Sequence, residues 1–253
     1  MTPTSLTGRR AVVTGGSRGL GRGIALALAK EGADVGIIYR KRRDEAEEVA
    51  REIEKEGVRA AIACADVAQW DEAEPALNAV ADELGGLDIV VANAGVANPT
   101  ISLADTPPDR WRKIMSVNLD GAFFTVKAAI PHLLTTGRGG SIVFVSTVGS
   151  LKGAPMQGAY VTSKAGVNEM ARTWALELAA DGIRVNAVAP GIFETDMTAI
   201  MLEMRGEEAS NALVPLGRVG APIELGRTVA MLCSDAASYV TGEVIRVDGG
   251  LGA

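Results

Sequence analysis

Short apolar segments rich in β-branched residues alternate with longer amphipathic segments along the chain, and this alternation limits the fold more than any other feature. The strand-like segments cover residues 11–15, 34–40, 60–66, 87–95, 141–147, 183–191 and 243–250. Between several of them lie segments with helical periodicity, at residues 20–30, 44–56, 71–84 and 159–180. Because a strand–helix–strand crossover is right-handed, repeating it builds a parallel sheet with helices on both faces. The sequence therefore predicts a doubly wound α/β fold.

No Pro-rich or Ser-rich linker interrupts the alternation, so we expect residues 1–253 to form one domain. Residues 191–222 are the irregular part: they carry Met197, Met201, Met204 and Pro215 and are too broken for an ordinary connection. We interpret them as a lid over a substrate site. A surface insertion with a short helix is the alternative.

Charge and composition exclude several classes of partner. The 25 basic and 31 acidic residues give a net charge of −6, which disfavours nucleic acid and anionic membranes as partners. No stretch reaches about 18 uninterrupted apolar residues, and the first ten residues contain no apolar run typical of a signal peptide. Cys64 and Cys233 lie far apart without metal-ligand spacing. We expect a cytoplasmic protein with reduced cysteines and no metal.

A glycine-rich turn follows the first predicted strand. The segment TGGSRGLG places Gly15, Gly19 and Gly21 around Ser17, and Leu20 opens the next helix. Glycines let the backbone approach a pyrophosphate, and the helix that follows offers free N–H groups and the positive end of its dipole. At this position in a strand–helix–strand unit, the turn predicts a dinucleotide site in a Rossmann-type fold.

The end of the second predicted strand favours a phosphorylated dinucleotide. It reads Tyr39, Arg40 and then residues 41–43, all basic, whereas Asp34 lies at the wrong end of the strand to reach a ribose. Arg40, with Arg18 from the glycine turn, is a candidate partner for a 2′-phosphate, so we expect NADP(H) to be preferred and NAD(H) to be possible. Residues 41–43 are alternatively a solvated basic patch.

Further small or polar residues collect at the ends of the predicted strands. In an open α/β sheet the ligand crevice lies beyond the carboxyl ends of the strands, so these residues should border one cleft. They are Asp66, Val67, Asn93, Ala94, Gly95, Thr147, Pro190 and Gly191.

Tyr160 and Lys164 open a predicted helix at spacing i, i+4 and so share one face. An ammonium beside a phenol favours the phenolate, which lowers the pKa of the tyrosine toward the range of efficient proton exchange with an alcohol or ketone. Taken alone the pair is weak, because surface helices often carry such spacings.

Five motifs in order make the chain resemble the short-chain dehydrogenase/reductase family. They are TGGSRGLG, ANAG after the fourth predicted strand, Asn118 within MSVNLDGAFF, YVTSK, and the terminal VDGG. The resemblance covers about residues 7–250. It implies hydride transfer between a nicotinamide and a carbonyl or carbinol carbon.

The resemblance also implies catalytic roles. Tyr160 would be the acid or base, Lys164 would lower its pKa and hold the ribose, and Asn118 would anchor a water in a proton relay. The family uses a serine thirteen residues before the tyrosine to hold the substrate carbonyl, and this count reaches Thr147. Ser146 is the alternative; because strand side chains alternate between faces, only one of the two should enter the cleft.

For the cofactor, the resemblance implies contacts from Asp66 to the adenine, from Asn93–Gly95 to the adenosine side, and from Ile192 and Thr195 to the nicotinamide. Each residue has a structural alternative: Asp66 and Thr195 are also suitable helix caps, and Gly95 is a suitable turn residue.

The substrate is the least determined part. We expect a moderately hydrophobic pocket and a small free ketone or secondary alcohol, with candidate contacts at Leu151, Met156, Ile192, Phe193, Met197 and Met201. One alternative is a 3-oxoacyl-(acyl-carrier-protein) reductase, although only Arg138 and Arg172 favour an acidic carrier. Another is a non-catalytic dinucleotide-binding regulator. The family usually forms tetramers, which here implies a homotetramer through about residues 109–134 and 159–180.

Overall fold

The seven predicted strand segments form one parallel sheet in a computed structural model of the chain, which describes residues 4–97 and 100–253 apart from the side chains of residues 200, 201, 204, 205 and 207. The strand order is β3-β2-β1-β4-β5-β6-β7. The strands are β1 (Arg10–Thr14), β2 (Asp34–Tyr39), β3 (Ala60–Cys64), β4 (Ile89–Ala92), β5 (Gly140–Val145), β6 (Ile183–Pro190) and β7 (Val244–Val247). The predicted doubly wound Rossmann-type fold is confirmed.

The order of the strands reverses direction between β1 and β4, which pair directly through Val12 and Val90. From β1 the chain first builds outward through β2 and β3, and then returns to build the other half from β4. At such a switch point the loops after the two central strands turn to opposite faces and leave a crevice at the carboxyl edge. The glycine turn follows β1 and the ANAG turn follows β4, so both border this crevice.

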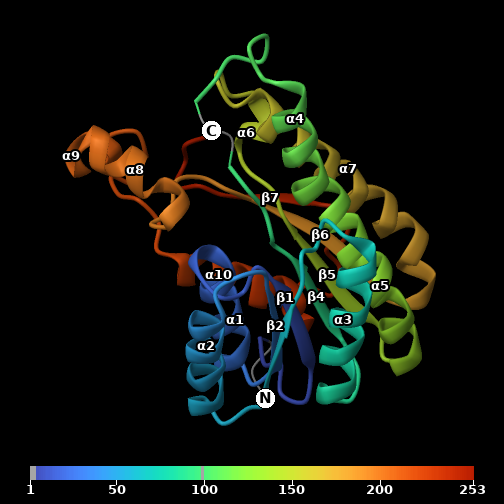
Figure 1. The fold of residues 1–253 in the computed structure, drawn as a ribbon. Helices are drawn as coiled ribbons and strands as arrows, with labels where there is room; N and C mark the ends of the chain where they lie inside the picture. The colour runs from blue at the N-terminus through green and yellow to red at the C-terminus, as the bar shows by residue number, and fades with distance from the viewer. Residues whose placement is uncertain (1–3, 98–99) are drawn as a thin grey trace.

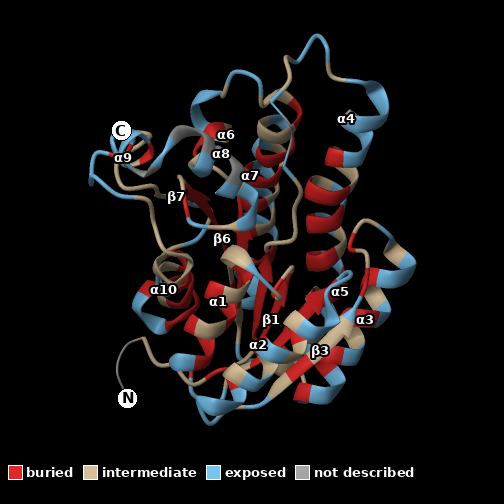
Figure 2. Ribbon diagram, turned by 60° about the vertical axis from the view of Figure 1, so that its left-hand side comes forward, coloured by how far each residue is buried: buried red, intermediate tan, exposed pale blue. Residues whose placement is uncertain are grey.

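Two layers of helices cover the sheet (Figure 1). One layer holds α1 (Gly19–Lys30), α2 (Arg43–Lys55) and α10 (Pro222–Cys233); the other holds α3 (Trp70–Leu84), α5 (Gly121–Thr136) and α7 (Gly158–Leu178). Figure 2 shows the buried residues of both layers turned toward the sheet. Two apolar cores result, one beneath each layer, as the parallel fold requires.

Shorter helices lie near the carboxyl edge or close the connections. They are α4 (Pro108–Met115), the π-helical turn η1 (Ser116–Asp120), α6 (Gly149–Lys152), η2 (Ala179–Asp181), α8 (Asp196–Arg205), α9 (Glu207–Asn211) and η3 (Asp235–Ala237). The predicted lid segment contains α8 and α9, which stand out from the rest of the molecule in Figure 1. Within the described ranges, no helix is both long enough and apolar enough to cross a bilayer.

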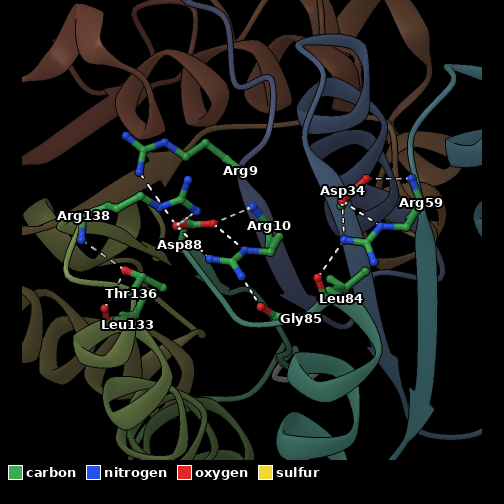
Figure 3. Close-up of polar contacts among 10 residues, drawn as sticks. All are labelled: Arg9, Arg10, Asp34, Arg59, Leu84, Gly85, Asp88, Leu133, Thr136 and Arg138. Carbon is green, nitrogen blue, oxygen red and sulfur yellow. Dashed lines mark hydrogen bonds and ion pairs between the residues drawn. The ribbon is translucent and has the colours of Figure 1, made fainter.

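The opposite, amino edge of the sheet is held by the buried carboxylate of Asp88 (Figure 3). Asp88 accepts hydrogen bonds from the backbone N–H and the Nε of Arg10 at 3.0 and 2.8 Å, and from Arg138 at 2.8 Å. Burial alone would raise the pKa of Asp88, but the hydrogen bonds and charge of Arg10, with the charge of Arg138, outweigh burial and lower it. This cluster ties β1, β4 and the loop before β5 together, far from the crevice.

Candidate active site

The glycine turn between β1 and α1 is too tightly packed for side chains at its key positions. Gly15 and Gly19 have φ of +66° and +54°, in the left-handed region. A Cβ on Gly21 would lie 2.1 Å from the carbonyl oxygen of Gly15, and one on Gly15 would lie 3.0 Å from the Cα of Ala94. The turn therefore brings bare backbone to the crevice.

The first turn of α1 has properties that fit a bound pyrophosphate. Arg18, at the N-cap, makes no side-chain cap hydrogen bond, and the first turn contains no acidic residue. The first N–H groups of a helix have no partners within the helix, and here no side-chain cap satisfies them. Ser17 and Leu20 are half-buried beside the turn. These residues would hold the diphosphate of a dinucleotide.

The ANAG turn is bound to β1. The Nδ2 of Asn93 donates to the carbonyl oxygens of Thr14 and Gly15 at 2.8 and 3.2 Å. In return the hydroxyl of Thr14 accepts from the backbone N–H groups of Asn93 and Ala94. The side chain of Asn93 therefore shapes the glycine turn, a structural role that the sequence reading did not assign.

Three of the four basic residues after β2, the arginines, are paired with a carboxylate. Arg40 contacts Asp66 at 2.9 Å, so two residues predicted to bind different parts of the cofactor contact each other instead. Asp66 also accepts from the N–H of Ala68 at 3.2 Å, which forms a turn before α3, but the N-cap of α3 is Gln69, so Asp66 is not the helix cap offered as its structural alternative. Tyr39 is buried, whereas Arg40 remains exposed at the carboxyl edge.

Arg42 and Arg43 form ion pairs with Glu45 and Glu47 within their own helix. Such pairs are typical of a solvated helix face. They fit the alternative interpretation of residues 41–43 as a basic patch.

Tyr160 and Lys164 lie in the first two turns of α7, as predicted, but burial dominates both. Only 3% of Lys164 is exposed, and its Nζ donates to the carbonyl oxygen of Val145 at 2.7 Å. Burial raises the pKa of Tyr160 to about 12, against a smaller lowering by the neighbouring Thr147 side chain. Burial also lowers the pKa of Lys164 to about 8. The predicted lowering of the tyrosine pKa by the ammonium is therefore wrong for the protein alone, since desolvation raises this pKa and the group that lowers it is Thr147 rather than Lys164.

The two candidate hydroxyls after β5 point in different directions. Thr147 lies beside the phenol of Tyr160, whose pKa its side chain lowers. Ser146 is buried, and its Oγ lies 3.2 Å from the carbonyl oxygen of Lys164 and 3.1 Å from the Oγ of Ser150. This is the alternation of faces expected at the end of a strand. Of the two, Thr147 is the one beside Tyr160.

Asn118 occupies the π-helical turn η1 between α4 and α5. Its Oδ1 accepts from the N–H of Val96 at 2.8 Å, and its Nδ2 lies 3.1 Å from both the carbonyl of Val96 and the Oγ of Ser163. A Cβ on Gly95 would lie 3.3 Å from Asn118 Oδ1 and 3.4 Å from Lys164 Nζ. The π-turn thus brings the buried amide beside Lys164, and such turns are frequent at functional sites.

Two polar residues behind Thr147 were not predicted. Asn168 Nδ2 donates to Ser150 Oγ at 2.8 Å, and Ser150 donates to the carbonyl oxygen of Thr147 at 2.6 Å. The Oδ1 of Asn168 is buried without a hydrogen-bond partner in the described structure. Asn168 follows Lys164 by four residues, so the helical spacing that relates Tyr160 to Lys164 could have identified it.

The end of β6 and the start of α8 approach the cofactor crevice. Pro190 is buried and accepts from the N–H of Val148, while Gly191 donates to the carbonyl of Val247. Thr195 caps α8, in agreement with its structural alternative. It also lies against the glycine turn, because a Cβ on Gly19 would be 3.5 Å from its Cγ2. Capping and proximity to the crevice coexist at this residue.

The predicted substrate contacts have separate outcomes. Leu151, Met156 and Met197 are exposed, and Met156 has a φ of +64°, which is uncommon for a residue with a side chain. Ile192 is half-buried. The side chain of Met201 lies outside the described residues.

Phe193 is a correction among these contacts. Its ring is buried in the core of the α1 and α10 layer, against Gly220. An apolar ring beside a lid was expected to face substrate, but packing beneath the lid removes it from the crevice.

A family model described as Enoyl-(Acyl carrier protein) reductase matches residues 15–252. The chain belongs to the short-chain dehydrogenase/reductase family. Two curated members illustrate the range of the family. The 3-oxoacyl-(acyl-carrier-protein) reductase FabG of Staphylococcus aureus is 40% identical over 243 residues, which cover 96% of this chain and 98% of that protein. L-rhamnose 1-dehydrogenase (NAD(P)(+)) of a Sphingomonas species is 39% identical over 247 residues, 97% of each.

Solved structures of short-chain dehydrogenases/reductases superpose on the whole chain. A provisionally assigned short-chain alcohol dehydrogenase from Sinorhizobium meliloti 1021 has a TM-score of 0.92 and 41% identity, with 98% of each chain covered. Carveol dehydrogenase from Mycobacterium avium in complex with NAD has a TM-score of 0.91 and 33% identity, with 97% of this chain and 98% of that one covered. The RhlG/NADP complex of Pseudomonas aeruginosa has a TM-score of 0.92 and 32% identity, with 100% of each chain covered. This chain is accordingly a nicotinamide-dependent oxidoreductase acting on CH–OH or C=O groups.

Proposed function

We propose that the chain is an NADP(H)-preferring oxidoreductase of small free ketones or secondary alcohols, in which Tyr160 exchanges a proton with the substrate oxygen. The placement of the Thr147 side chain beside the phenol of Tyr160, one helical turn from buried Lys164, is the observation that carries this proposal. Two adjacent hydroxyls can each donate to one carbonyl oxygen, Thr147 to hold it and Tyr160 to protonate it.

When bound, the dinucleotide supplies a hydride to a carbonyl carbon or accepts one from a carbinol. Tyr160 then gives its proton to the developing alkoxide in the reductive direction. A pKa of about 12 keeps the phenol protonated at neutral pH, so the protein alone is suited to donate. In the oxidative direction Tyr160 must accept a proton, and this requires a positive charge that lowers its pKa after the dinucleotide binds.

Lys164 and Asn118 would position the other groups. With a pKa of about 8, Lys164 remains mostly an ammonium at pH 7, and only one of its three donors is used by the carbonyl of Val145. The other donors are free to hold a ribose hydroxyl. Asn118 Oδ1 accepts one hydrogen bond and retains a lone pair with which to anchor a water for the proton relay.

The preference for NADP(H) rests on Arg18 and Arg40. Both side chains are about half exposed at the carboxyl edge, and each already contacts a carboxylate oxygen within 3 Å. A guanidinium that holds a carboxylate in this way can hold a phosphate with the same geometry. NAD(H) lacks the 2′-phosphate and would leave both pairs unchanged.

A 3-oxoacyl-(acyl-carrier-protein) reductase is the second candidate, supported by the 40% identity to the staphylococcal enzyme. Against it, the two arginines that could steer an acidic carrier are already in ion pairs, Arg138 with Asp88 and Arg172 with Glu169. Turnover of a free 3-oxo ester but not of the carrier-linked one would separate the candidates.

We extend the proposal to the lid and the assembly. Residues 191–222 would close over the substrate through α8, whose Met197 is exposed. A homotetramer is supported by the exposed apolar side chains of Phe123 and Leu134 on α5 and of Leu176 on α7. Light scattering of the purified chain tests the assembly: a monomer at micromolar concentration contradicts it.

The decisive experiment measures turnover of a ketone panel with NADPH and NADH in parallel. We expect a higher kcat/KM with NADPH, and a loss of about 10²- to 10⁴-fold in Tyr160→Phe. Thr147→Ala should lose most of its activity, whereas Ser146→Ala is the matched control and should retain it. A strong preference for NADH overturns the roles of Arg18 and Arg40. Full turnover of Thr147→Ala with loss in Ser146→Ala overturns the assignment of the hydroxyl.

Binding of either dinucleotide without turnover across the panel would instead favour the non-catalytic regulator.

A further inference from the structure

An ion pair joins the glycine turn to the first turn of α8. Arg18 Nη1 lies 2.6 Å from Asp196 Oδ2, with 49% and 65% of the two side chains exposed. The neighbouring residue Thr195 lies against Gly19, so the contact belongs to a close approach of the two segments. The two charged residues are 178 positions apart in the sequence.

Among the residues described, Asp196 is the only carboxylate of α8 in an ion pair with the basic residues near the glycine turn. The other cations have partners from nearby elements: Arg40 pairs with Asp66 after β3, and Arg42 pairs with Glu45 in α2. Asp196 also adds to the field at Arg42, whose pKa its charge raises slightly in addition to the larger effect of Glu45. The carboxylate of Asp196 therefore lies among the cations that surround the proposed 2′-phosphate position.

We propose that Asp196 is a cofactor-specificity residue, whose carboxylate occupies Arg18 in the place of the 2′-phosphate and is displaced when a phosphorylated dinucleotide binds. The inference rests on the proposed function, because it takes Arg18 as a ligand of that phosphate. It adds a competing anion supplied by the lid segment.

Charge and exposure determine the direction of the effect. A 2′-phosphate carries close to two negative charges at neutral pH and is a stronger partner for a guanidinium than a carboxylate. Binding of NADPH must still break the contact between Arg18 and Asp196 and then tolerate the released carboxylate nearby. NADH requires neither step. Asp196 therefore weakens NADPH selectively and makes the start of α8 respond to the phosphate.

The test compares the Kd of NADPH and NADH for the wild type and for Asp196→Asn, by quenching of protein fluorescence. We expect NADPH to bind about two- to fivefold tighter to the variant at low salt, the range typical of an exposed ion pair. The Kd of NADH should be unchanged. The gain should shrink at 0.5 M NaCl, because exposed charges are screened.

Glu194→Gln is the matched control. It removes the same charge from the same segment, and Glu194 is exposed without an ion pair among the described residues. This variant should leave the ratio of the two Kd values unchanged. Asp196→Glu should restore the wild-type ratio in part, since it returns a carboxylate to the position.

A double variant isolates the pair. In an Arg18→Met background, Asp196→Asn should improve NADPH binding clearly less than it does in the wild type, because only the repulsion between the carboxylate and the phosphate is then removed. Weaker NADPH binding by Asp196→Asn would overturn the inference, because it would mean that Asp196 positions Arg18 for the phosphate. An equal change for both dinucleotides would also overturn it. If the wild type does not bind NADPH, it is the proposed function that fails.

Discussion

Lys164 is almost completely buried, and the burial that places it in the site also disfavours its charged form through desolvation. Among the residues described, its ammonium donates one hydrogen bond, to the carbonyl oxygen of Val145, and forms no ion pair. A buried ammonium without a carboxylate is costly to the folded state. The position is therefore expected to trade stability for function.

Lys164→Met should raise the free energy of unfolding at pH 7 by about 1–3 kcal/mol while abolishing turnover. The pKa of Lys164 falls from 10.5 to about 8 on folding, so the unfolded chain binds more protons between these values. The destabilisation of the folded state by the buried ammonium is complete below pH 8 and disappears as the pH rises toward 10.5. Urea unfolding of wild type and variant from pH 7 to 10.5 measures it.

In that experiment the difference between the two proteins should narrow as the pH rises. Lys30→Met, at the exposed end of α1, is the control and should change stability by less than about 0.5 kcal/mol at every pH. A Lys164→Met variant that is less stable than wild type at pH 7 would show that the hydrogen bond to Val145 outweighs desolvation.

At the scale of elements, α1 and α10 cross in direct contact at two glycines. A Cβ on Gly226 would lie 2.3 Å from the carbonyl oxygen of Gly23, and one on Gly23 would lie 2.5 Å from the carbonyl carbon of Pro222. At both glycines the nearest atom that a Cβ would meet belongs to the backbone of the other helix, which cannot rotate away as a side chain could. The close approach also fixes α1, whose first turn faces the crevice.

Gly23→Ala should destabilise the protein by about 1–3 kcal/mol, because the new methyl group forces the two helices apart. Thermal unfolding measures the change. Gly166→Ala in α7 is the matched control, since its Cβ would meet chiefly the mobile end of the Leu119 side chain, at 2.8 Å. There the better helix propensity of alanine should offset the contact and leave stability within about 1 kcal/mol. Equal losses in both variants would contradict the argument.

The predicted elements follow the sequence closely where local periodicity decides. The segment predicted at 44–56 corresponds to α2 at Arg43–Lys55, and the one predicted at 71–84 corresponds to α3 at Trp70–Leu84. The π-turn η1 was not predicted, because a segment of five residues is too short to show a periodicity of its own. Its position is set by the contact of Asn118 with Val96 and Ser163.

At the scale of the whole molecule, Asp88 and Asp34 form two arginine clusters at the amino edge of the sheet (Figure 3). They differ in burial. The Asp88 side chain is fully buried among Arg9, Arg10 and Arg138, whereas the Asp34 pair with Arg59 is partly exposed. The first cluster joins both halves of the doubly wound sheet.

Asp88→Asn should cost about 2–4 kcal/mol of stability at pH 7, because it removes the buried carboxylate that holds the partly buried Arg10 and its neighbours Arg9 and Arg138. The pKa of Asp88 is lowered on folding, so its contribution is complete above the unfolded value near 4 and is lost as the pH falls through the folded value. Acid unfolding of the two proteins should therefore converge at low pH. Asp34→Asn breaks the partly exposed pair with Arg59 and should cost about 1 kcal/mol of stability or less. An equal loss of stability in Asp34→Asn and Asp88→Asn would show that burial does not determine the strength of these ion pairs.

The sequence by itself determined the order of strands and helices, the glycine turn and the spacing of Tyr160 from Lys164. All of these depend on residues close together in the chain, through side-chain periodicity and backbone conformation. Only the tertiary structure decided the direction of the two pKa shifts, the hydroxyl beside Tyr160, the burial of Phe193 and the pairing of Arg18 with Asp196. These depend on desolvation and on contacts between distant segments, which local patterns do not encode.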